Sequence, residues 1–66
     1  MAVSYKKLWK VLIDKDLKKK DMKEAANISW ATVTKLSKGE YVSMEILERI
    51  CRALEVDFAD VVEVAY

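Results

Sequence analysis

The sequence predicts an all-α fold, a compact domain of five short helices around one small core. Apolar residues recur at helical spacing in successive segments, and serine, asparagine and glycine stand where those helices should begin or end. The composition, 53% hydrophobic and 35% charged, is too apolar for a disordered chain and too charged for a membrane span. At 66 residues, the chain is expected to form a single domain over 1–66 with a small core.

The first predicted helix begins at Tyr5, behind Ser4 as its cap, and runs to about Lys15. Leu8 and Leu12 form its apolar stripe. A second helix is predicted over 19–26, with an inner face of Met22, Ala25 and Ala26. Lysines at 18–20 oppose the dipole at its start, a cost that a bound phosphate there would offset.

The third predicted helix runs from Trp30 to Ser37 or Lys38. Asn27 favours a left-handed backbone that ends the preceding helix, Ser29 caps the new one, and Gly39 closes it. Its core-facing residues are Val33 and Leu36.

The fourth predicted helix, Met44 to Leu54, begins after the cap Ser43. Its predicted buried face consists of Ile46, Leu47, Ile50, Cys51 and Leu54. Asp57 is expected to cap a last short helix from Phe58 to Val61 or Val62. The β-branched tail at 61–66 is a candidate short strand, for which Ala2-Val3 is the available partner in a two-stranded β pairing of the termini.

Several classes of function are disfavoured. A single cysteine allows no internal disulfide, and the absence of histidine excludes the usual Cys/His zinc site. The sequence has no Ser/His or Cys/His pair and no glycine-rich phosphate loop, so we expect neither an enzyme nor a cofactor, metal or small-molecule substrate. No uncharged run approaches the roughly 20 residues of a membrane helix. Cys51 is expected to be a buried thiol in a reducing, cytoplasmic setting.

Charge is strongly divided along the chain although the net charge is only +1. Residues 1–38 contain ten lysines and four acidic residues, a net of +6, whereas 39–66 contain two arginines and seven acidic residues, a net of −5. A basic half favours contact with a polyanion, and the acidic half would face away or meet another protein. The simpler interpretation is a solvated lysine surface, which we expect for Lys6, Lys7, Lys10 and Lys15.

Two short helices joined by a tight turn, the second capped by Ser29, form a helix-turn-helix pattern. Residues 17–39 resemble the phage Cro/cI-like (xenobiotic-response-element-like) repressors, and 43–54 resemble that family's fourth helix. The matching positions are Asp21-Met22, Ala26, Asn27, Ile28, Ser29, Thr32-Val33, Lys35 and Gly39. The resemblance implies a lambda-repressor-like fold and a bacterial or phage regulator, a repressor in its simplest form, that binds double-stranded DNA sequence-specifically.

The resemblance places a recognition helix at about 30–38 in the major groove. The expected base-contacting residues are Ser29, Trp30, Ala31, Thr34 and Lys35, and the expected phosphate-contacting residues are Lys18, Lys19, Thr32, Lys38 and Tyr41. Trp30 departs from the family pattern, because relatives usually have a polar residue there. It could instead fold onto the first helix or a dimer surface, and Thr32 could be structural.

The apolar C-terminal segment exceeds what a small core needs. We expect a homodimer surface formed by Phe58, Val61, Val62, Val64 and Tyr66, the alternative being that the tail closes the core of one chain. An alternative function for the same fold is a protein-interaction module, such as an antitoxin or anti-repressor partner, that uses the acidic half or Trp30 for contact.

Overall fold

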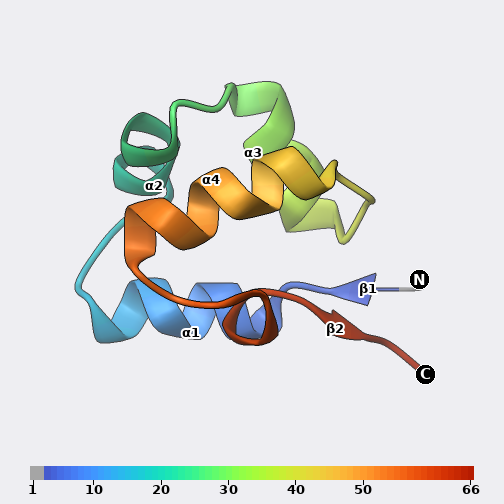
Figure 1. The fold of residues 1–66 in the computed structure, drawn as a ribbon. Coiled ribbons are helices and arrows are strands. Elements are labelled where there is room, and N and C mark those ends of the chain that lie inside the picture. Colours follow the sequence, from blue (N-terminus) through green and yellow to red (C-terminus); the bar gives the residue numbers. More distant parts are fainter. Residues whose placement is uncertain (1–2) are drawn as a thin grey trace.

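The computed structural model describes residues 3–66, which form four α-helices, one 3-10 turn and a two-stranded pairing (Figure 1). The elements are β1 (Val3–Ser4), α1 (Lys6–Asp14), α2 (Lys19–Ala26), α3 (Trp30–Lys38), α4 (Met44–Leu54), η1 (Phe58–Asp60) and β2 (Glu63–Val64). The expectation of a fifth α-helix is wrong, because residues 58–60 make only a single 3-10 turn before the chain extends into β2.

Helix α4 crosses the middle of the domain, with α1 on one side and α2 and α3 on the other (Figure 1). The two ends of the chain lie beside each other, where β1 pairs antiparallel with β2. Val3 is opposite Val64 and Ser4 is opposite Glu63, which confirms the predicted pairing of the termini for Val3. Ala2, the other residue of the predicted strand, lies outside the described residues.

One hydrophobic core joins all four helices. Its fully buried large side chains come from every helix and the tail: Leu8, Met22, Leu36, Ile50 and Val61. The predicted inner faces of α1 and α3 are confirmed, but Ala25 is exposed and Ile46 is only partly buried. Helix α2 buries the i, i+4 pair Met22 and Ala26, and Ala25 falls at the edge of that narrow stripe.

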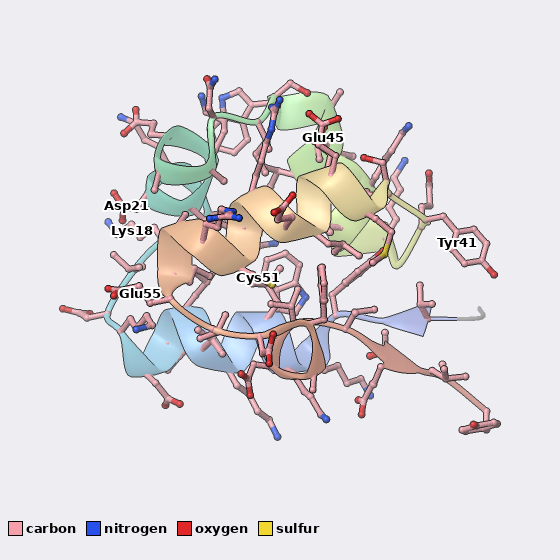
Figure 2. The ribbon with its side chains drawn as sticks, in the orientation of Figure 1. Lys18, Asp21, Tyr41, Glu45, Cys51 and Glu55 are labelled. Carbon is pink, nitrogen blue, oxygen red and sulfur yellow. The ribbon has the colours of Figure 1, made fainter. Side chains whose placement is uncertain are left out.

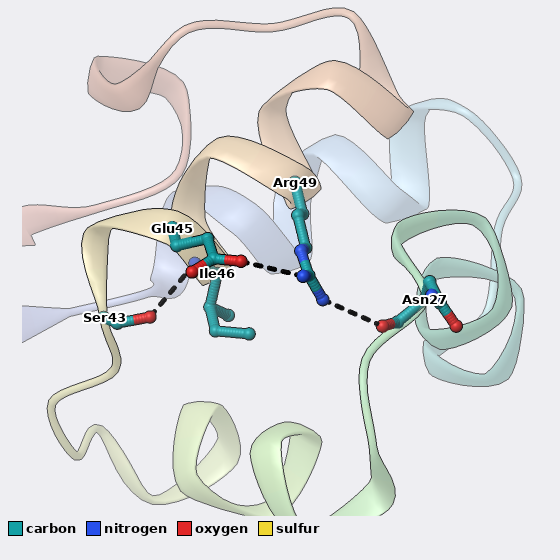
Figure 3. Close-up of polar contacts among 5 residues, drawn as sticks. All are labelled: Asn27, Ser43, Glu45, Ile46 and Arg49. Carbon is teal, nitrogen blue, oxygen red and sulfur yellow. Dashed lines mark hydrogen bonds and ion pairs between the residues drawn. The ribbon is translucent and has the colours of Figure 1, made fainter.

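The predicted helix ends are largely confirmed. The Ser29 hydroxyl accepts a hydrogen bond from the Thr32 N–H at 3.2 Å, and Ser43 accepts one from Ile46 at the same distance (Figure 3). Gly39 closes α3 with φ 74°. Helix α1 starts one residue later than predicted, with Tyr5 as its N-cap.

Cys51 lies on the side of α4 that faces α1 and is buried (Figure 2). Burial raises the pKa of its thiol, and the charges of Asp57 and Asp60 raise it further. A raised pKa lowers the thiolate fraction at neutral pH, and the thiolate is the reactive form. We therefore expect iodoacetamide to modify Cys51 far more slowly in the folded protein than in denaturant. Equal rates in the two states, measured by mass spectrometry, would contradict this placement.

Candidate nucleic-acid interface

The turn between α2 and α3 sets the angle of the helix-turn-helix pair. Asn27 adopts the predicted left-handed conformation, with φ 56°, and Ile28 is buried beneath the turn. Arg49 of α4 supports the turn from the other side: its guanidinium donates to the Asn27 carbonyl at 3.4 Å and to the Glu45 carboxylate at 2.8 Å (Figure 3). This role of Arg49 was not predicted, although the i, i+4 spacing of Glu45 and Arg49 is a visible signal of a helical ion pair.

Helix α3 turns one face to the core and the other to solvent. Val33 and Leu36 are buried, while the expected base-contacting residues are all exposed: Ser29, Trp30, Ala31, Thr34 and Lys35. From Trp30 onward these residues are spaced so that they share one side of the helix. The structure therefore gathers the predicted group on a single outward-facing strip.

Trp30 remains at the surface, with 54% of its area exposed. Its ring is approached by the Lys23 ammonium of α2 at 5.4 Å from the ring centroid, a cation–π distance. The alternative in which Trp30 packs onto α1 as extra core is therefore wrong for the single chain. The Lys23 contact was not predicted, since it depends on the angle between α2 and α3.

The hydroxyls of this strip are already engaged within the chain. Thr34 Oγ1 donates to the Trp30 carbonyl at 2.9 Å, so its proton is used and its oxygen remains an acceptor. Ser29 Oγ serves as the cap and lies 3.1 Å from Thr32 Oγ1. Thr32 is half-buried, and its contact with the Ser29 cap is structural. That contact does not depend on whether Thr32 also touches a ligand.

The expected phosphate-contacting lysines and tyrosine are all exposed, and they lie at the start of α2, at the end of α3 and in the loop that follows α3. The Lys18 backbone N–H donates to the Asp21 carboxylate at 2.9 Å, which fixes the start of α2, and Figure 2 shows the two residues side by side. Lys38 is exposed at the end of α3, and Tyr41 projects outward from the loop between α3 and α4 (Figure 2).

Lys19 links three helices. Its ammonium donates to Ser37 Oγ of α3 at 3.0 Å and lies 4.6 Å from the centroid of the Trp9 ring of α1. Neither partner carries a charge that would neutralise the ammonium. Lys19 is thus held in place while keeping its positive charge and its unused donors.

Most lysines remain without a carboxylate partner. Within residues 3–66 the ion pairs are Lys7–Glu63 at 3.7 Å, Arg49–Glu45 at 2.8 Å and Arg52–Glu48 at 3.0 Å. Two of these three ion pairs join an acidic residue of the C-terminal half to an arginine of the same half. The acidic residues of that half therefore leave most lysines of the N-terminal half without a partner.

The C-terminal apolar residues separate into two groups. Phe58, Val64 and Tyr66 are exposed, and Val62 is partly buried. Val61 is fully buried within the single chain, so the expectation that it faces a second copy is wrong. It reaches the core because η1 turns the chain back toward α1 and α4, and the sequence alone does not show which valine of the tail points inward.

Residues 7–65 match the Cro/C1-type HTH DNA-binding domain family. The chain belongs to this family. The structure is also similar to the crystal structure of the transcriptional regulator VanUg, Form II, with a TM-score of 0.94 and 48% sequence identity over 97% of this chain and 85% of that one. A search of curated proteins finds no match.

Membership of the Cro/C1-type family confirms the resemblance noted in the sequence. It makes the chain a helix-turn-helix DNA-binding domain of the kind found in transcriptional regulators, and not an enzyme. None of the helices within residues 3–66 has the length and apolar character needed to traverse a bilayer.

Proposed function

We propose that this chain is a transcriptional regulator that reads double-stranded DNA with α3 in the major groove and represses by occluding a promoter in the cytoplasm. The observation that carries this proposal is the exposed strip of α3 bordered by lysines that lack carboxylate partners. The major groove accommodates one helix, and the exposed side chains near that helix's N-terminus reach the base edges.

Each residue of the strip suits a different base feature. Lys35 donates to guanine O6 and N7, and Ala31 packs against a thymine methyl group. Because the Thr34 proton is used within the helix, its oxygen accepts from the amino group of adenine or cytosine. Trp30 presents its indole ring to thymine methyl groups, and the cation–π contact with Lys23 of α2 holds the ring in place.

The residues around the strip contact the backbone. Lys18, Lys19 and Lys38 neutralise phosphates, and Tyr41 and Thr32 offer hydroxyls, whereas Ser29, the cap of α3, faces the bases. These contacts set register and affinity without reading sequence.

Lys19→Ala should weaken binding to every duplex alike and flatten the plot of log affinity against log salt by about one unit, because one phosphate contact is lost. Fluorescence anisotropy across a salt series measures both quantities. Lys10→Ala is the matched control, since Lys10 is an exposed lysine of α1 outside the proposed interface, and it should leave the slope unchanged. If Lys19→Ala retains the parent slope, Lys19 does not contact phosphate.

We further propose that the regulator acts as a homodimer through Phe58, Val64 and Tyr66, with Val62 at the edge. These exposed apolar side chains lie on and beside the terminal strand pair. A single domain buries only about 600–1,000 Å² on DNA, and a two-fold dimer doubles this contact. Sedimentation velocity at micromolar concentration should show a dimer that Tyr66→Ser with Val64→Ser weakens. A strict monomer at all concentrations would contradict the assignment.

Selection of bound duplexes from a random pool tests the function as a whole. The expected result is an enriched pseudo-palindrome whose half-sites are about 34 Å apart. No enrichment, together with stoichiometric co-purification of a protein partner, would overturn the proposal in favour of a protein-interaction module of the same fold.

A further inference from the structure

An apolar groove lies between the second half of α1 and the start of α2, on the flank of the interface. It is open to solvent, has a volume of about 410 Å³ and is lined by Trp9, Leu12, Ile13, Leu17, Lys18 and Lys19. Pockets that bind small molecules typically span about 300–1,000 Å³ and have mainly apolar walls with a few polar groups. The volume of this groove falls within that range, and its lining is mainly apolar, although the groove is open on one side.

Part of the apolar surface that lines the groove is not packed against the core. Ile13 is 75% exposed although it is a large aliphatic residue, and Trp9 and Leu17 are only partly buried against the core. An exposed isoleucine beside a half-buried tryptophan and leucine provides a contiguous apolar surface for a ligand. A single exposed apolar residue would carry no such meaning.

The charge at the rim selects the kind of ligand. Lys18 and Lys19 border the groove on the α2 side, and no acidic residue lines it. Three acidic residues close by in sequence do not line the groove. The Asp21 carboxylate accepts a hydrogen bond from the Lys18 backbone N–H, and Asp14 and Asp16 are exposed to solvent. The Lys19 ammonium lies 4.6 Å from the centroid of the Trp9 ring, which is one wall of the groove, and also donates to Ser37 Oγ at 3.0 Å.

We propose that this groove binds a small amphipathic carboxylate. Its apolar body packs against Trp9, Ile13 and Leu17, and its carboxylate pairs with Lys18 and Lys19. The size of the groove suits one compact hydrocarbon group, and a lining that includes two lysines and no acidic residue favours an anionic head group.

Occupancy of the groove weakens DNA binding, a consequence that depends on the proposed function. Lys18 and Lys19 are the same lysines that contact phosphate in that proposal. A carboxylate paired with them offsets one of their two positive charges and occupies donors that the DNA backbone needs, so ligand and DNA compete. The groove thus gives the DNA-binding domain its own site for an effector.

Titration with phenylbutyrate tests the site without DNA. In a Trp30→Phe background, Trp9 is the remaining tryptophan, and its fluorescence should change with saturation. Phenylbutanol, which has the same apolar body without the charge, should bind roughly two- to fivefold more weakly, as expected for loss of an exposed ion pair. Butyrate, which keeps the carboxylate but lacks the phenyl ring, should give no saturable change. Absence of saturation by phenylbutyrate, or equal binding of the alcohol, would overturn the proposal.

A matched pair of variants locates the site. Ile13→Ser should weaken phenylbutyrate binding at least fivefold, because it removes one apolar wall at an exposed position. Met44→Ser, at an apolar position on α4 that is 64% exposed, should leave binding unchanged. Equal effects of the two substitutions would show that the probe binds elsewhere and would overturn the assignment.

The link to DNA is tested with the unsubstituted protein on the selected duplex. Phenylbutyrate should lower the apparent DNA affinity several-fold, and the Ile13→Ser protein should be less sensitive. Saturable binding with unchanged DNA affinity would overturn the competition step. Failure of DNA binding in the absence of phenylbutyrate would count against the proposed function alone, because the fluorescence titration is independent of DNA.

Discussion

Ile50→Ala should destabilise the domain by about 2–5 kcal/mol, because it removes methylene and methyl groups from a fully buried position and leaves a cavity. Ile50 lies on α4, the helix that runs between α1 on one side and α2 and α3 on the other (Figure 1). A chain of this length has a small core and a total stability near the lower end of about 5–15 kcal/mol. Urea unfolding followed by circular dichroism should therefore show a midpoint at a much lower urea concentration than for the parent protein.

Ile13→Ala provides the matched comparison, since the same atoms are removed from a position that is 75% exposed. Its free energy of unfolding should stay within about 0.5 kcal/mol of the parent. Similar losses for both variants would mean that the core is not organised around α4.

Lys35→Ala should lower affinity for the selected duplex by about 1–3 kcal/mol and relax the preference for guanine at one position of each half-site. The physical reason is that Lys35 projects from the exposed strip of α3 and is placed to donate to a base edge. Anisotropy titrations against the selected duplex and against variants of each base pair measure the change.

Lys38→Ala is the control on the same helix. Lys38 is proposed to contact phosphate, so its loss should weaken binding to all duplexes by a similar factor and leave the base preferences intact. If Lys35→Ala behaves in the same way, Lys35 contacts the backbone and does not read a base.

The elements that were predicted correctly depend on local chemistry. Ser29, Ser43 and Gly39 end or begin helices through contacts within three or four residues, and such signals are readable from sequence. The left-handed Asn27 was predicted for the same reason. The strip on α3 followed from helical spacing once Val33 and Leu36 were assigned to the core.

The features that were missed depend on contacts between distant parts of the chain. Lys19 reaches Ser37 and Trp9 only because α1, α2 and α3 converge, and Lys23 reaches Trp30 only at the observed angle of the turn. The last predicted helix shortens to a 3-10 turn because the segment after it pairs with β1. The same turn buries Val61, a detail that apolar composition does not reveal.

The groove beside α2 also depends on tertiary structure. Its six lining residues are spread over 9–19, and their identities are compatible with an ordinary amphipathic helix and loop. Only the fold shows that Ile13 stays exposed while Trp9 is half-covered, so that an open apolar wall adjoins two lysines.

Interference by dimethyl sulfate on the selected duplex tests the central claim most directly, because the reagent methylates guanine N7 in the major groove and adenine N3 in the minor groove. With α3 in the major groove, methylation of guanine N7 within each half-site should block binding, and adenine N3 methylation there should have little effect. If only adenine N3 methylation reduces binding, or if guanine N7 methylation has no effect at any position, the placement of α3 is contradicted.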